Sequence, residues 1–342
     1  MLVALPCLGV ETSEEGRLLD SLILGAKGLS KGAGDKGWRI TISYFPKYTA
    51  IGEKIYMVDR GLKSWPVELP VAAVHAKIVT DGFRFRSDII PNQDGQIKYP
   101  PGAVRSPYLI FDGNRFVFSD NGGVRITDDR PIAGFPLPME MITQMAFEAS
   151  PAQCPNWSIF SKGLNWVDMI STSRDKASLA ISQKSTATTV IETNLGNGYS
   201  GPFFHAEFDN KWPLWPSVLI SGYTHKGLAE KTCEVEFREY QNFGNIILPK
   251  EIVAILKLNM ESSCYNIPSL IEQKTRLISM GVPMNGTYKL FEHRLIIENV
   301  ENVDVKSSFD APLEPGVEVR NDITGEHFIW GDKLEKLSRQ LR

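Results

Sequence analysis

A strict alternation of apolar and polar residues at positions 38–44 is the feature that most constrains the fold. Every second residue from Trp38 to Tyr44 is apolar, and the three residues between them are polar. Successive side chains of a strand point to opposite faces of a sheet, so this pattern buries one face and leaves the other in water. The segment therefore predicts a strand of an antiparallel sheet.

Similar strand patterns continue along most of the chain. The turns between the early ones carry Asx-Gly pairs, which supply the positive φ that tight hairpins need. These pairs are Asp81-Gly82, Asp94-Gly95, Asp112-Gly113 and Asn121-Gly122. Strands are predicted in the apolar runs at 54–58, 70–80, 83–90, 107–111, 115–118, 124–126, 179–181, 190–191, 203–208, 218–223, 233–238, 246–248, 252–258, 288–290, 295–297 and 317–319. The chain is thus predicted to be rich in meandering antiparallel strands.

A few segments have helical spacing instead. A capping box at 12–15 opens an amphipathic helix that ends near Gly28. Apolar residues at helical spacing predict further helices at 137–147 and 160–170, and the charged tail 333–342 predicts a surface helix. Together with the strands, these segments predict an α+β fold that is mostly antiparallel β.

Composition excludes several functional classes. A hydrophobic fraction of 42% and a net charge of −3 are those of a folded chain, and the balance of charges provides no basic field for nucleic acid. An apolar run of about 18 residues, which a membrane-spanning helix needs, is absent from the sequence. We therefore predict neither nucleic-acid binding nor a transmembrane helix.

The sequence motifs do not predict catalysis. Gly32–Gly37 has the letters G-x-G-x-x-G, but a helix precedes it and a strand follows, the reverse of a dinucleotide site. Gly198–Gly201 lacks the spacing of a nucleophile elbow. The five histidines and four cysteines show no metal-ligand spacing. We predict no catalytic residue, no metal and no cofactor, and hence a protein that is not an enzyme.

The apolar opening segment 1–9 resembles the remainder of a secretory signal, and it predicts an extracytoplasmic, periplasmic or envelope-associated protein. Cys7 follows Pro6, which fits a lipid-attachment site poorly. In an exported chain, Cys233 and Cys264 could form a disulfide, whereas scattered buried thiols are the alternative.

Two passages resemble the periplasmic lipoprotein carrier superfamily. Residues 110–118 are similar to its strand–Asp-Gly–strand hairpin, followed by the strand at 124–126 and the helix at 137–147. Residues 203–258 are similar to its late strands, including a hairpin from Tyr240 to Pro249. The resemblance implies a curved, incomplete β-barrel of roughly eleven strands wrapped over a few helices. It also implies an apolar cavity and no catalytic residue.

These expectations define a domain organisation and a function. We expect a signal remnant at 1–12, a single half-barrel domain at 13–305, and a C-terminal extension at 306–342 with a short strand and a surface helix. We expect the half-barrel to bind an acyl chain, a lipid or an acylated protein, with possible peripheral association with the envelope. The alternatives are an envelope interaction module without a cavity ligand, or an envelope hydrolase.

The candidate ligand-binding residues are the apolar side chains expected to point into the barrel. They are Leu18, Leu22, Trp38, Ile40, Phe116, Met141 and Met145. The alternative for each of them is ordinary packing in the core.

Overall fold

The structure is a computed structural model that describes most of the chain between residues 36 and 331. The described ranges are 36–59, 61–64, 74–81, 84–91, 107–112, 114–120, 122–128, 179–193, 201–209, 216–225, 228–243, 246–263, 266, 268–306, 308–310 and 313–331. The predicted helices at 12–28, 137–147, 160–170 and 333–342 lie outside these residues.

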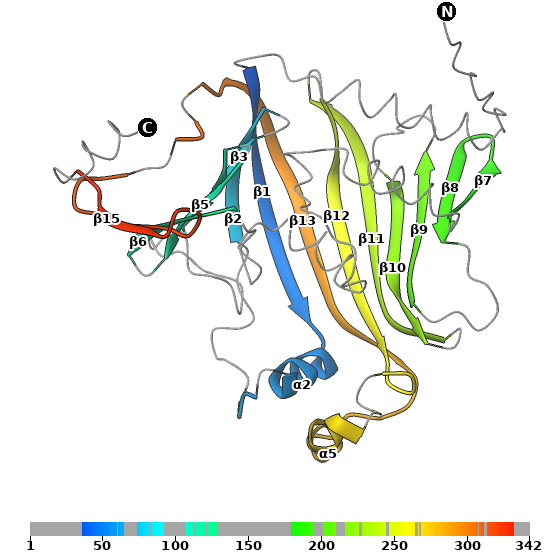
Figure 1. Cartoon of the computed structure of the whole chain (residues 1–342). Coiled ribbons are helices and arrows are strands. Elements are labelled where there is room, and N and C mark those ends of the chain that lie inside the picture. Colours follow the sequence, from blue (N-terminus) through cyan, green and yellow to red (C-terminus); the bar gives the residue numbers. More distant parts are fainter. Residues whose placement is uncertain are drawn as a thin grey trace, which may run out of the picture.

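The described part of the chain forms one large sheet (Figure 1). Its strands are β1 (Lys36–Tyr48), β2 (Val74–Thr80), β3 (Phe85–Ile90), β4 (Tyr108–Phe111), β5 (Phe116–Asp120), β6 (Gly123–Thr127), β7 (Leu179–Ser185), β8 (Thr188–Thr193), β9 (Gly201–Asp209), β10 (Pro216–His225), β11 (Leu228–Phe243), β12 (Ile246–Asn259), β13 (Thr287–Asp304), β14 (Glu318–Asn321) and β15 (Glu326–Ile329). They lie in the order β15-β14-β6-β5-β4-β3-β2-β1-β13-β12-β11-β10-β9-β8-β7.

The predicted antiparallel character is confirmed. Every pair of neighbouring strands is antiparallel except β6 and β14, which are parallel. The sheet has 15 strands, more than the roughly eleven expected, and β14 and β15 from the C-terminal part account for two of the additional ones. Because β7 and β15 are its two edges, the sheet is open.

The long strands bend along their length (Figure 1). Glu239 has a positive φ of 53°, and the register of β11 with β12 is the same on both sides of it, with Arg238 opposite Glu251 and Tyr240 opposite Pro249. β12 continues through Pro249, and β13 is likewise one continuous strand. β13 was predicted as two separate pieces, at 288–290 and 295–297.

Two helices lie at one end of the sheet (Figure 1). The prediction of a strand at 54–58 is wrong, because these residues belong to helix α2 (Ala50–Asp59). The Thr49 hydroxyl accepts a hydrogen bond from the Gly52 amide at 3.0 Å and so caps the helix. A Cβ on Gly52 would lie 1.8 Å from the Leu290 carbonyl oxygen, so glycine allows α2 to approach β13 closely.

The second helix, α5 (Ile271–Ser279), follows a short 3-10 turn (Pro268–Leu270) and packs against α2. No helix was predicted there. Leu277 is its one fully buried side chain, whereas Ile271 and Ile278 are exposed. The residue before α5, Leu270, makes no side-chain cap, so the usual start signal is missing from the sequence.

The buried apolar residues form two clusters on opposite faces of the sheet. The main cluster occupies one face, which we call the core face, and extends from Phe116 on β5 to Ile191 on β8. The second cluster lies on the other, outer face. It consists of Val79, Ile110, Val117, Val124, Val305, Phe309 and Val319. We call β2–β6 with β14 the short-strand region, and β1 with β9–β13 the long-strand region.

Candidate functional site

Three of the seven predicted ligand-binding residues belong to the described structure. Trp38 and Ile40 on β1 and Phe116 on β5 are all buried in the main cluster on the core face. The structure therefore brings these three side chains to one face, and their contact with a ligand stays a prediction. The other four, Leu18, Leu22, Met141 and Met145, lie outside the described residues.

The core face is almost free of ionisable groups. Among the described residues no Asp, Glu, Lys or Arg is buried, and the buried polar side chains are otherwise Ser, Thr and Asn. The exception is His293 on β13, which is 0% exposed. Its cross-strand neighbour on β12 is Ala254, whose small side chain leaves the imidazole bounded mainly by aromatic rings.

Aromatic side chains surround His293 at the end of the sheet near α2. The Phe291 ring stands edge-on to the imidazole, with centroids 4.2 Å apart, and Tyr48 does the same at 5.5 Å. Tyr56 of α2 extends this group through an edge contact with Tyr48 at 5.9 Å. Helix α2, whose residues 54–58 were predicted as a strand, therefore contributes to this aromatic group.

Tyr44 provides the hydrogen-bond partner of His293. The Tyr44 hydroxyl is hydrogen-bonded to His293 Nδ1, and the two rings are nearly parallel with centroids 5.4 Å apart. Burial lowers the pKa of His293 to about 3 and raises the pKa of Tyr44 well above its ordinary value. Both side chains are therefore neutral near pH 7. The second imidazole nitrogen, Nε2, is buried and has no hydrogen-bond partner among the described residues.

Sequence reasoning treated His293 only as one of five histidines without metal-ligand spacing. The signal that could have identified it is its register in β13. Phe291, Leu295 and Ile297 lie on the core face and are buried in the main cluster. His293 lies between Phe291 and Leu295 on the same face, where the alternating pattern would place an apolar residue. A histidine at an apolar strand position is a buried polar group that needs a partner.

A serine, a histidine and a carboxylate meet on the outer face of β1, β2 and β13. Ser43 Oγ lies 2.7 Å from His75 Nδ1 and donates its hydrogen to Glu298. In a serine hydrolase the imidazole lies between the serine and the acid and accepts the serine proton. Here the serine lies in the middle and is 0% exposed, so the arrangement is not that of an activated nucleophile.

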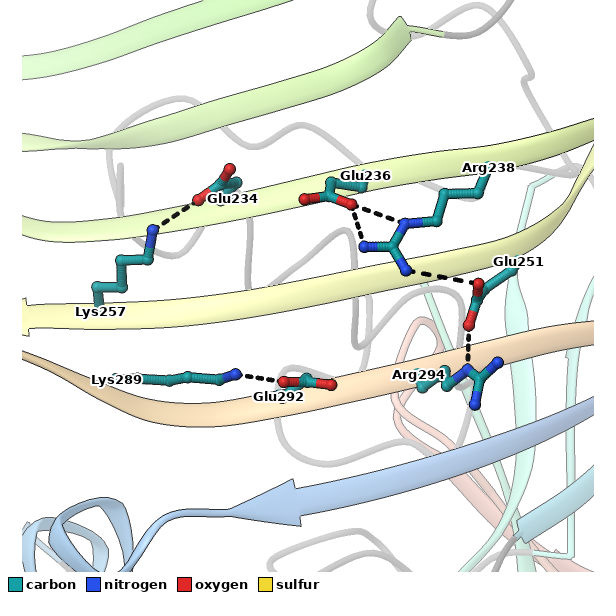
Figure 2. A network of polar contacts seen from close by, with 8 residues as sticks. All are labelled: Glu234, Glu236, Arg238, Glu251, Lys257, Lys289, Glu292 and Arg294. Atoms are coloured by element: carbon teal, nitrogen blue, oxygen red, sulfur yellow. Dashed lines mark hydrogen bonds and ion pairs between the residues drawn. The ribbon is translucent and has the colours of Figure 1, made fainter.

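The outer face of the long-strand region carries a lattice of ion pairs (Figure 2). Glu251 on β12 contacts Arg238 on β11 at 3.6 Å and is also paired with Arg294 on β13. Hydrogen bonding to Lys289 holds the pKa of Glu292 below its usual range. The lattice consists of Glu234, Glu236, Arg238, Glu251, Lys257, Lys289, Glu292 and Arg294. Four acids balance four bases, so the lattice itself carries no net charge.

The part of the chain that the structure describes contains no group of three His, Cys, Asp or Glu side chains placed to hold a metal ion. Within it, no helix is both long and apolar enough to cross a bilayer. Cys233 is buried on the core face of β11, and Cys264 lies outside the described residues, so the predicted disulfide alternative stays open.

Comparison with known proteins finds distant structural similarity only. No family model matches the chain. No curated protein matches it either. A domain described as an outer membrane lipoprotein-sorting protein from Vibrio parahaemolyticus is 8% identical, with a TM-score of 0.36 over 85% of this chain and 95% of that one. A DUF1329 family protein from Desulfovibrio piger is 8% identical, with a TM-score of 0.29 over 85% and 99% of the two chains. Both scores are low, and neither similarity assigns a function to this chain.

Proposed function

We propose that the protein binds an apolar ligand, such as an acyl chain, a lipid or an acylated protein, on the core face of its open sheet, without catalysing a reaction. The observation that carries this proposal is the core face itself. It is apolar from β5 to β8, and among the described residues it has no buried Asp, Glu, Lys or Arg and one buried polar atom without a partner.

The energetics of such binding are favourable. Moving a methylene group from water to an apolar surface gains about 0.8 kcal/mol. An acyl chain with about ten buried methylenes therefore gains about 8 kcal/mol before the cost of ordering it. Affinity of this kind needs neither a covalent bond nor a catalytic group. An extracytoplasmic location and an acylated-protein partner remain predictions from the sequence.

Extraction tests the proposal directly. The full chain, purified without detergent, should release a lipid into organic solvent, which mass spectrometry would identify. The delipidated protein should then bind a fluorescent fatty-acid probe saturably, and unlabelled lipid should displace it. Release of no lipid together with no saturable probe binding would refute the proposal.

Adjacent residues on β12 provide a matched pair of variants. Ala254 points to the core face beside His293, and Val253 points to the outer face. Ala254→Leu and Val253→Phe add similar volume on opposite faces. We expect Ala254→Leu to weaken probe binding about tenfold and Val253→Phe to leave it unchanged, in proteins with similar melting temperatures. Equal effects of the two substitutions would place the ligand away from the core face.

A further inference from the structure

Helix α5 carries the two most exposed large apolar side chains among the described residues. Ile271 is 66% exposed and Ile278 is 53% exposed, whereas the next, Ile329 on β15, is 49% exposed. The two α5 residues are about two helical turns apart, so they lie on one face of the helix, pointing away from the buried Leu277. In Figure 1 this helix lies at the lower end of the sheet, beyond α2. An apolar stripe is therefore exposed at one end of the sheet.

The hydroxyl groups on the same face are satisfied by the helix itself. Thr275 lies in the stripe between the two isoleucines, and its Oγ1 donates to the Ile271 carbonyl oxygen at 2.8 Å. Ser279, beside the stripe, donates in the same way to the Arg276 carbonyl oxygen at 2.8 Å. These hydroxyls can therefore leave water without an unpaired donor. The methyl group of Thr275 adds to the apolar stripe.

Opposite charges flank the stripe. Helical spacing places Lys274 on one side of it and Glu272 on the other. Lys274 Nζ donates to Asn266 Oδ1 at 2.8 Å, and Glu272 is exposed. A zwitterionic phospholipid head group carries one phosphate and one ammonium, so the two flanks are complementary to both of its charges. An apolar stripe between a cation and an anion matches the interface of a neutral bilayer.

The stripe is too small to form a stable protein interface by itself. Such interfaces take about 20–30 residues from each side. The stripe consists of three side chains on a helix of nine residues, which is about 13 Å long. A bilayer interface requires no complementary shape, and it takes up single apolar side chains in proportion to the area that they bury.

We infer that α5 docks on a membrane of zwitterionic lipids, with Ile271, Thr275 and Ile278 inserted at the level of the head groups. Lys274 then faces lipid phosphate, and Glu272 faces lipid ammonium groups. This surface is separate from the core face, so its contact with a membrane goes beyond the proposed function and does not depend on it. It gives a defined contact surface to the peripheral envelope association expected from the sequence.

Sedimentation of the full chain with vesicles of phosphatidylcholine and phosphatidylethanolamine tests this contact. The wild-type protein should sediment with the vesicles. Ile271→Gln combined with Ile278→Gln should lower the partition coefficient about a hundredfold, about tenfold for each inserted isoleucine. The matched control is Ile323→Gln combined with Ile329→Gln, which removes two exposed isoleucines elsewhere and should leave the coefficient unchanged. Melting temperatures should be similar, because all four side chains are exposed.

A variant that strengthens binding provides a test independent of any loss of folding. Thr275→Leu extends the apolar stripe and favours the helix, so it should raise the partition coefficient about fivefold. Because the stripe has no net charge, raising the salt from about 0.1 M to about 1 M should leave the wild-type coefficient nearly unchanged.

Several results would overturn the inference. They are a wild-type protein that stays in the supernatant, equal losses in the two double variants, no gain from Thr275→Leu, and a partition coefficient that collapses in high salt. Self-association without vesicles that the Ile271/Ile278 variant removes would identify the stripe as a contact between two copies, and would also overturn it. Lipid released by extraction bears only on the proposed function, so the two failures are distinguishable.

Discussion

The outer face of the sheet differs between its two regions. In the short-strand region this face carries the buried second cluster, which includes Ile110, Val117 and Phe309, beside the Arg86–Asp88 ion pair. In the long-strand region it carries the exposed lattice of ion pairs around Glu251 (Figure 2). The core face is apolar in both regions.

The difference shows that the C-terminal part of the chain is a structural cover. Val305 and Phe309 pack on the short strands in the second cluster, and β14, which carries Val319, extends the sheet by pairing with β6. Strands that are buried on both faces have continuous apolar runs, such as 116–118, whereas 233–238 alternates with charged residues. The two regions should therefore respond differently to the same substitution.

The largest difference is expected for a lysine introduced on the outer face. Ile110 is fully buried, and its cross-strand neighbours are Arg86 and Val117, so Ile110→Lys buries a cation directly opposite a guanidinium. We expect a loss of about 4 kcal/mol or more in the free energy of unfolding, measured with urea.

The matched control is Ile255→Lys in the long-strand region. The cross-strand neighbours of Ile255 are Glu234 and Glu292, and its own side chain is only half-buried. A lysine there gains two carboxylate neighbours and should cost at most about 1 kcal/mol. Equal losses at the two positions would show that the outer face is not divided as described.

Truncation of Phe309, which packs on the short strands, should cause the next largest loss of stability. Phe309 is 7% exposed, and the Arg84 guanidinium lies 4.5 Å from its ring centroid. Phe309→Ala should cost about 3 kcal/mol, at the lower end for a buried phenylalanine. Phe45, on the outer face of β1, is 39% exposed, and Phe45→Ala should cost less than about 1 kcal/mol. A small loss for Phe309→Ala would mean that the C-terminal segment covers the strands without stabilising them.

Most strands could be predicted from sequence because their signal is local. The alternation at 38–44 and the turn at Asn121-Gly122 are each contained within a few residues, and Gly122 indeed has a positive φ. The run 54–58 was misread because a short apolar run fits a strand as well as a helix. What decides it is contact between α2 and Leu290, far along the chain. The parallel pairing of β14 with β6 is equally non-local.

In the candidate site, the burial of single residues was predictable from local patterns, but contacts between distant strands were not. Alternation placed Trp38 and Ile40 on the buried face, and the structure confirms their burial. The environment of His293 depends on Tyr44, which is 249 positions away in the sequence. Pairing of distant strands creates that environment, so no local pattern could reveal it.

Lowering the pH should reduce the free energy of unfolding through the buried His293 on the core face. Burial lowers the pKa of His293 from 6.5 to about 3, so below pH 6.5 the unfolded chain binds a proton that the folded chain does not. Stability is therefore lost as the pH falls through this window, by up to about 1.4 kcal/mol per pH unit. Urea unfolding between about pH 7 and pH 5 should show a loss of about 2 kcal/mol that His293→Phe removes. A variant with the same pH slope as the wild type would contradict the burial of a neutral imidazole.

The smallest effect is expected within the ion-pair lattice. Glu251→Gln removes an ion-pair partner that Arg238 and Arg294 share. The side chains of these two arginines are 46% and 53% exposed. Exposed pairs are weak because water screens them and long side chains lose freedom, so the cost should be about 1 kcal/mol or less. At about 1 M salt the difference from wild type should disappear. Glu234→Gln, which loses only Lys257, is the milder comparison. A large loss at Glu251 that persists in high salt would mean that charge, and not the apolar core face, holds the long strands together.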